Sequence, residues 1–180
     1  MEEKTKYSII LRNLHLIGGV AFIAALILGL VMEEMERGPE KFQLMFFHKS
    51  LGLAVLGLAA FRLLEWMRSA QPEALDTHTV WEIRAAKAVK AGLYVVMIGL
   101  PVSGVLMSWY NGHPAAFFGL FEWTPMVEKS KNMGDFFEEI HETLVPFTFI
   151  LLGLHIVGAL KHHFLDQDQT LLRISPFSKN

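Results

Sequence analysis

Four long apolar runs, separated by charged segments, are the feature that most constrains how this sequence folds. Residues 14–32 and 91–110 carry no Asp, Glu, Lys or Arg, and residues 143–160 form a third uncharged run. A shorter run at residues 51–64 is extended by apolar residues at 42–47. About 20 apolar residues suffice for a helix to cross the roughly 30 Å hydrocarbon layer of a bilayer.

The four runs predict an all-α fold, an integral membrane four-helix up-down bundle. We expect helices at about residues 9–32, 42–66, 88–110 and 136–162, within one domain spanning residues 1–180. The composition agrees, because 52% of the residues are hydrophobic and 19% are charged, below the ~25% that is usual in soluble domains. The first run is too long for a cleaved signal peptide, and the charged segment EEMERG follows it in place of a cleavage site.

The basic residues predict how the bundle is oriented. If both termini and the loop at residues 65–90 share one side, eleven of the 16 Lys and Arg residues lie on that side and five lie on the other. The positive-inside rule then places the N- and C-termini in the cytoplasm. The net charge of −2 gives no indication of nucleic-acid binding.

Four of the eight histidines fall within or at the edges of the predicted spans, at two depths. Their order along an up-down bundle places His15 and His155 near the inner side, and His48 and His141 near the outer side. Each pair joins two different helices at similar depth, as ligation of one haem iron by two imidazoles requires. An unpaired polar ring in hydrocarbon is costly, whereas an Fe–N bond satisfies it. We therefore predict two b-type haems, bound without thioether links because the chain has no cysteine.

The residues around these histidines allow two interpretations each. Four nearby glycines either let a flat ring approach the backbone or pack helices together, namely Gly18, Gly19, Gly52 and Gly153. His78 and His113 are expected to be solvated in loops. His162 and His163 either anchor the last helix at the interface, or His162 contacts a quinone or a haem propionate.

The sequence resembles the bacterial cytochrome b-561 proteins, which are small di-haem b-type cytochromes with four transmembrane helices. The resemblance is carried by FFHKSLGLAVLGLAAFRLL at 46–64, GLYVVMIGLPVSGVLMSWYNG at 92–112 and IHETLVPFTFILLGLH at 140–155, followed by ALKHHFLDQDQTLLRISP. It implies a multi-pass protein of the bacterial inner (plasma) membrane. It also implies the ligand pairing reached above, with His48 and His141 on the outer haem and His15 and His155 on the inner haem.

The resemblance further implies electron exchange with ubiquinone or a similar quinone. For one type in the family it implies an oxidoreductase that oxidises superoxide at the outer face. The predicted outer segments carry ten acidic and five basic residues, a net charge of −5, and an acidic surface repels an anion. Superoxide would therefore need a local patch of basic residues to attract it to the outer face. Lys49, next to His48, either attracts such an anion or contacts a haem propionate, and no catalytic acid or base is identified.

Two other functions compete with this interpretation. A haem-bearing relay or subunit would exchange electrons with a soluble electron-transfer protein docked on the acidic outer face. A haem-free scaffold or transporter would use the histidines for contacts between helices. Membrane lipid is an expected partner in each case.

Overall fold

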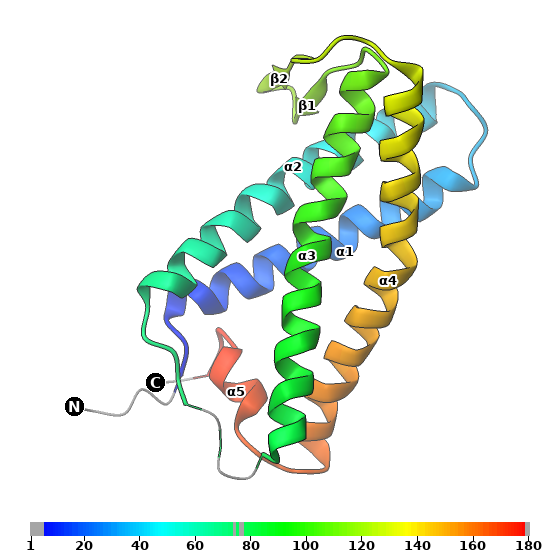
Figure 1. Ribbon diagram of the computed structural model, residues 1–180. Helices are drawn as coiled ribbons and strands as arrows, with labels where there is room; N and C mark the ends of the chain where they lie inside the picture. The colour runs from blue at the N-terminus through cyan, green and yellow to red at the C-terminus, as the bar shows by residue number, and fades with distance from the viewer. Residues whose placement is uncertain (1–5, 74, 76–77, 179–180) are drawn as a thin grey trace.

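The computed structural model describes residues 6–73, 75 and 78–178. Within these residues, four helices are long and apolar enough to cross a membrane: α1 (Ile9–Glu33), α2 (Pro39–Arg68), α3 (Val80–Tyr110) and α4 (Lys131–Phe164). A hairpin of two short strands, β1 (Ala115–Phe117) and β2 (Phe121–Trp123), follows α3, and the short helix α5 (Thr170–Ile174) follows α4 (Figure 1). The predicted fold, a four-helix membrane bundle, is confirmed.

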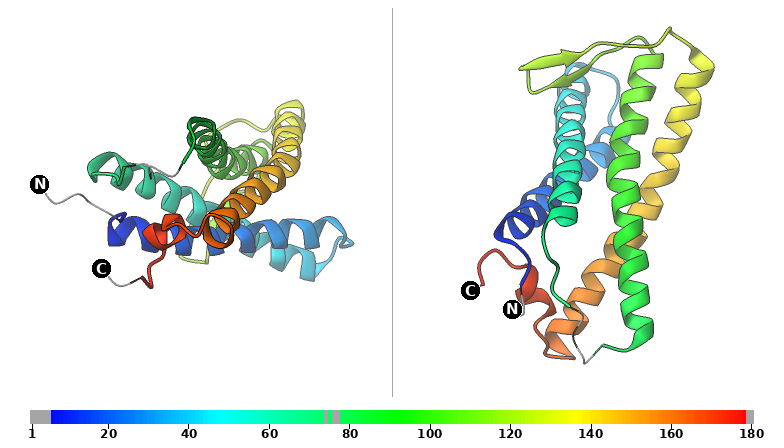
Figure 2. Two further views of the ribbon diagram at one scale, coloured as in Figure 1. Left: turned by 90° about the horizontal axis from the view of Figure 1, so that it is seen from below. Right: turned by 60° about the vertical axis from the view of Figure 1, so that its left-hand side comes forward.

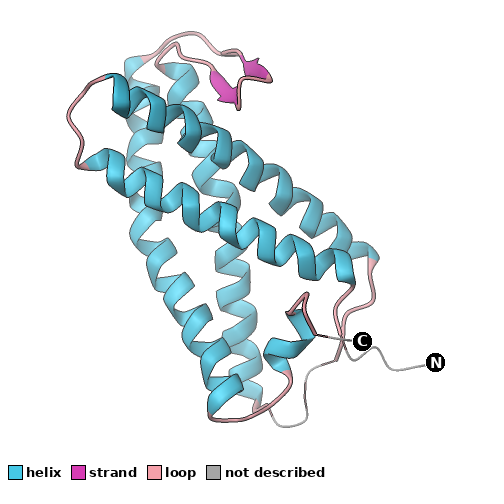
Figure 3. Ribbon diagram, turned by 180° about the vertical axis from the view of Figure 1, so that it is seen from behind, coloured by secondary structure: helices cyan, strands magenta, loops and turns pink. Residues whose placement is uncertain are grey.

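The four helices form two antiparallel hairpins. α1 packs against α2, and α3 packs against α4, while α2 and α3 join the two hairpins. The hairpins are inclined to each other, as the views in Figures 2 and 3 show. The beginning of α1, the end of α4 and α5 lie at one end of the bundle, and the β-hairpin lies at the other end (Figure 1). We call these the inner and outer ends. Two of the eleven basic residues counted on the side of the termini, Lys4 and Lys179, lie outside the described residues.

Three helices begin earlier than the hydropathy pattern predicts, because the residues just before the apolar runs favour the start of a helix. α3 begins at Val80 rather than near residue 88, where Thr79 and Glu82 form a reciprocal capping box. α4 begins at Lys131 rather than near residue 136, and the Ser130 hydroxyl accepts a hydrogen bond from the Met133 amide. α2 begins at Pro39 rather than near residue 42, since proline is well suited to a first helical turn. The β-hairpin and α5 were not predicted.

The buried core is small and joins three helices. It contains Phe22 of α1, Val55 and Ala59 of α2, and Val96, Met97 and Leu100 of α3. Most other large apolar side chains point outward. In the most apolar stretch of α4, only 6% of the residues are buried. A soluble protein rarely exposes so large an apolar surface, whereas lipid covers it in a bilayer.

The β-hairpin is attached to the outer part of α2 by one buried side chain. The Ser50 hydroxyl is fully buried and accepts a hydrogen bond of 2.9 Å from the Phe118 amide. The same hydroxyl lies 2.8 Å from the Phe46 carbonyl and 3.1 Å from the Ala116 carbonyl, as a donor. The hairpin is therefore held beside the helix segment that carries His48.

Candidate functional site

The structure brings the four predicted histidines together in two pairs. At the outer pair, His48 of α2 and His141 of α4 have ring centroids 6.2 Å apart, with their planes inclined by 74°. At the inner pair, His15 of α1 and His155 of α4 have centroids 5.9 Å apart, with planes inclined by 85°. Each pair thus joins the α1–α2 hairpin to the α3–α4 hairpin, and α4 contributes one histidine to each.

The separation of the rings fits a metal ion between them. Two imidazoles bound to opposite faces of one ion at about 2.0 Å, with each centroid roughly 1.1 Å behind its bonding nitrogen, have centroids about 6.2 Å apart. The two observed separations, 5.9 and 6.2 Å, are close to this value. Haem iron is commonly held by axial imidazoles in this way. The donor set therefore suits haem, while the role of these histidines as iron ligands stays a prediction.

Hydrogen bonds orient both outer imidazoles. Nδ1 of His48 lies 2.9 Å from the Ala25 carbonyl oxygen of α1, and Nδ1 of His141 lies 2.9 Å from the Leu100 carbonyl oxygen of α3. A carbonyl oxygen only accepts, so each Nδ1 must carry the proton and donate. Each Nε2 then keeps its lone pair, as a metal ligand requires.

A buried serine, Ser103, provides a second hydrogen-bond acceptor for His141. Ser103 donates from its hydroxyl to the Leu100 carbonyl at 3.0 Å, and its oxygen lies 3.1 Å from Nδ1 of His141. That oxygen therefore accepts from the same Nδ1–H group. The two acceptors together restrict how the His141 ring can rotate.

Two glycines let the outer imidazoles lie close to neighbouring helices. A Cβ atom added at Gly29 of α1 would lie 3.3 Å from Cε1 of His48, and one added at Gly104 of α3 would lie 3.3 Å from Cε1 of His141. Gly29 follows Ala25 by four residues, and Gly104 follows Leu100 by four residues. Each imidazole thus bonds to a carbonyl and packs on a glycine one turn further along the same helix.

The four glycines considered from the sequence have other surroundings. A Cβ atom added at Gly18 would meet Cβ of Leu58 at 4.0 Å, which is ordinary packing between α1 and α2. Added Cβ atoms at the other three would meet no described protein atom within 4 Å, namely at Gly19, Gly52 and Gly153. Gly29 and Gly104 were not predicted from the sequence, although each lies four residues after the residue whose carbonyl accepts from the imidazole.

Lys49 is half-buried near the outer pair, where its ammonium group donates to the Ser108 hydroxyl at 2.7 Å. Ser108 belongs to the outer part of α3 and is itself buried. The lysine therefore ties α2 to α3 beside His48. Its predicted contact with a propionate or an anion stays a prediction.

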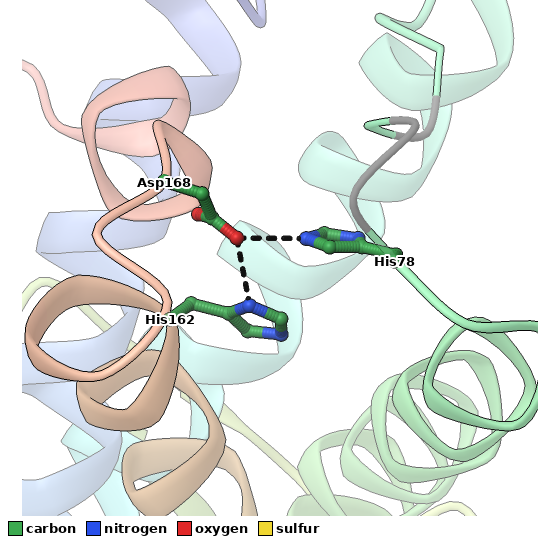
Figure 4. Close-up of side chains that lie close together, drawn as sticks. All are labelled: His78, His162 and Asp168. Carbon is green, nitrogen blue, oxygen red and sulfur yellow. Dashed lines mark hydrogen bonds and ion pairs between the residues drawn. The ribbon is translucent and has the colours of Figure 1, made fainter.

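A third group of polar side chains lies at the inner end, and the sequence did not predict it. Nε2 of His78 and Nδ1 of His162 each lie 2.9 Å from Oδ2 of Asp168 (Figure 4). His78 is not solvated as expected, since only 16% of its side chain is exposed. Burial works against the charged form of Asp168. Hydrogen bonds from Thr170, His78 and His162 outweigh that effect and hold the pKa of this carboxyl below its usual range, so it is ionised at neutral pH.

Four helices able to cross a membrane, with imidazoles paired between them, are typical of membrane-embedded cytochromes. Comparison with known proteins identifies the family, since the family described as prokaryotic cytochrome b561 matches residues 6–176. The chain belongs to this family of membrane electron-transfer proteins, in which the cofactor is b-type haem.

Three curated relatives agree with the family assignment. Cytochrome b561 homolog 1 of Escherichia coli (strain K12) is 30% identical over 132 residues, covering 73% of this chain and 74% of the relative. Cytochrome b561 homolog 2 of the same organism is 28% identical, with coverage of 94% and 90%. The probable superoxide oxidase CybB of Yersinia pestis is 27% identical over 164 residues, covering 88% of this chain and 92% of the relative. The resemblance inferred from the sequence is thereby confirmed, and the chain is a multi-pass bacterial membrane protein.

Proposed function

We propose that this protein is a di-haem cytochrome b that moves electrons from superoxide at its outer face to a quinone in the membrane. The observation that carries the proposal is the presence of two histidine pairs with ring centroids 5.9 and 6.2 Å apart. His48 and His141 would hold the outer haem, and His15 and His155 the inner one. When bound, haem iron alternates between Fe(III) and Fe(II) and so carries one electron at a time.

The residues of the chain supply binding, orientation and exclusion of water. The Ala25 and Leu100 carbonyls fix the proton on Nδ1 of the two outer imidazoles, which directs Nε2 toward the metal. The four helices that carry the pairs are long and apolar enough to lie in the bilayer, whose hydrocarbon excludes water. In the overall reaction, two superoxide anions each lose one electron and become O2. One quinone gains both electrons and two protons and becomes a quinol.

The proposed donor and acceptor are supported at the level of the family. One relative is named as a probable superoxide oxidase, at 27% identity. The structure describes a lysine near the outer pair, Lys49, whose charge would favour an anion. Stopped-flow mixing of the oxidised, purified protein with superoxide, in the presence and absence of ubiquinone-1, tests the reaction. We expect rapid appearance of the reduced α-band, and continued turnover only with the quinone.

The ligand assignment is tested by separate substitutions in the two pairs. We expect His141→Ala and His15→Ala each to lower bound haem from two per chain to one. The matched control is His113→Ala, an exposed histidine in the outer loop, which should leave haem content unchanged. Haem content is measured as the pyridine haemochrome. Equal haem content in the unaltered protein and the three variants would contradict the assignment.

The ring planes give a second test that needs no substitution. The planes are inclined by 74° and 85°, far from parallel. Ferric haems with near-perpendicular axial imidazoles give highly anisotropic low-spin EPR signals with a large gmax. Ordinary rhombic signals from both haems, as parallel imidazoles produce, would count against these pairs as ligands.

The second candidate function is electron exchange with a soluble protein docked on the outer face. It is favoured by the acidic outer segments and by the engagement of outer lysines in contacts within the chain. One of these lysines, Lys131, forms an ion pair with Asp135 at 2.7 Å. If superoxide leaves the isolated protein oxidised while a reduced basic cytochrome reduces it, the relay is supported and the superoxide reaction is excluded.

A further inference from the structure

The cluster at the inner end brings together side chains from distant parts of the chain. His78 lies in the connection between α2 and α3, His162 lies in the last turn of α4, and Asp168 lies between α4 and α5. Three donor atoms, one from each residue, lie within 4.8 Å of one another. The imidazole rings have centroids 4.4 Å apart (Figure 4). Among the described residues, this is the one group of three or more such side chains with metal-binding spacing.

The carboxylate is oriented toward the histidines by the backbone. The Thr170 amide donates to Oδ1 of Asp168 at 2.7 Å, which leaves Oδ2 directed toward both imidazoles. Only 6% of the Asp168 side chain and 15% of the His162 side chain are exposed. A carboxylate held by an outer hydrogen bond, next to two partly buried imidazoles, is the usual arrangement around metal ligands.

We propose that His78, His162 and Asp168 form a binding site for a divalent transition-metal cation of the zinc type. Nε2 of His78, Nδ1 of His162 and Oδ2 of Asp168 would be the ligand atoms. Two imidazole nitrogens and one carboxylate oxygen are a known zinc ligand set, whereas Mg²⁺ and Ca²⁺ prefer oxygen ligands. This site is separate from the proposed haem sites, and it is not required for the proposed electron transfer.

The two contacts to Asp168 are close in length to the ligand separations of a zinc site. In a tetrahedral zinc site with bonds of about 2.0–2.1 Å, neighbouring ligand atoms are roughly 3.3 Å apart. The two contacts to Oδ2 of Asp168 are 2.9 Å, so the atoms would move apart by a few tenths of an ångström. Both ring nitrogens would exchange an N–H proton for the metal, so binding should weaken as the pH falls.

A fourth position has candidates in the immediate surroundings. Oδ2 of Asp166 lies 2.9 Å from Nδ1 of His162, and the Thr170 hydroxyl lies 3.3 Å from Nε2 of His78. Asp166 is also paired with Lys161 at 2.6 Å, so a water molecule is the simpler fourth ligand. The bound ion would join the α2–α3 connection to the end of α4.

The proposal is tested by equilibrium dialysis of the haem-containing protein, purified without a polyhistidine tag and freed of metal with a chelator. With ZnCl₂ at pH 7.5 we expect one saturable zinc per chain, and no comparable binding of Mg²⁺. Because even outer-sphere partners of metal sites contribute 10- to 100-fold to affinity, His78→Ala and Asp168→Asn should each weaken binding by at least about tenfold. The matched control is His163→Ala, which removes the exposed histidine next to His162 and should bind zinc normally.

The haem spectrum of each variant shows whether the fold is intact, and it should not change in the three variants. The absence of saturable zinc binding, or equal affinity in the control and the ligand variants, would overturn the proposal. If a variant fails to fold, a measurement on the unaltered protein still tests the proposal. Zinc K-edge X-ray absorption should show two imidazole ligands, and a coordination shell of oxygen alone would overturn the proposal.

Discussion

At the scale of single residues, the outer histidines depend on two repeated contacts. His48 bonds to Ala25 and packs on Gly29, and His141 bonds to Leu100 and packs on Gly104. Within each hairpin, one helix carries the imidazole and the other supplies the carbonyl and the glycine. An imidazole without this support would be free to rotate away from the orientation that a metal ligand needs.

Gly104→Ala and Gly29→Ala should therefore disturb the outer pair. A Cβ atom at 3.3 Å from the imidazole is tighter than normal contact, so the ring must shift by a few tenths of an ångström. We expect a several-fold weaker hold on the outer haem, measured as haem loss to apomyoglobin. The control is Gly57→Ala, where an added Cβ meets no described atom within 4 Å. Gly57 lies nine residues after His48, half a turn from the His48 face of α2. Haem loss that is unchanged in both variants would show that the close approach is unimportant.

At the scale of elements, the β-hairpin is attached to α2 and to α3 by side-chain hydrogen bonds. Ser50 is fully buried and accepts from the Phe118 amide. Trp109 of α3 adds a second attachment, since its indole N–H donates to the Trp123 carbonyl at 2.9 Å. The hairpin thus covers the outer ends of α2 and α3 next to the outer pair.

Ser50→Ala should loosen this hairpin because it removes a fully buried hydroxyl that accepts from the Phe118 amide. The expected loss of stability is about 0.5–1.5 kcal/mol, the usual net contribution of one hydrogen bond. Hydrogen exchange at residues 115–123 should become faster, while exchange in the middle of α2 stays slow. Ser69→Ala, at the inner end of α2, is the control, since that hydroxyl accepts only from the Gln71 side chain in the described part of the chain. Equal exchange in both variants would contradict the role of Ser50.

At the scale of the whole molecule, both histidine pairs connect the two helical hairpins. α1 and α2 contribute one histidine each, α4 contributes two, and α3 contributes none. The protein contacts between the hairpins run mainly between α2 and α3. Bound haem would therefore add two further links between the hairpins.

Depletion of haem should accordingly lower the stability of the whole bundle. A ligand present at 1,000 times its Kd stabilises the folded state by about 4 kcal/mol. Protein produced under haem starvation should unfold at a lower temperature in detergent, measured by circular dichroism at 222 nm, and added haemin should restore the midpoint. An identical midpoint with and without haem would show that the hairpins hold together unaided.

The proposed orientation of the molecule can be tested cleanly because the chain has no cysteine. Single cysteines at Glu128, in the exposed outer loop, and at Phe177, in the exposed segment after α5, report the two sides. If both termini are cytoplasmic, a membrane-impermeant maleimide should label the Glu128→Cys variant in intact spheroplasts. It should label the Phe177→Cys variant only in inverted vesicles. The reverse pattern would place the termini outside.

The sequence by itself determined the membrane spans, the family and the four candidate ligands. Hydropathy and helical periodicity are local properties, so the depth of His15, His48, His141 and His155 follows from position along each span. Helix starts were less accurate, because caps such as Thr79 and Ser130 extend helices beyond the apolar runs.

Only the tertiary structure decided which atoms surround those residues. The contact of His48 with Ala25 depends on how α1 packs on α2, and that of His141 with Leu100 on how α3 packs on α4. The inner cluster depends on the path of two loops, since His78 and Asp168 are 90 residues apart in sequence. Such contacts arise from the relative placement of distant segments, and no local pattern of residue types encodes that placement.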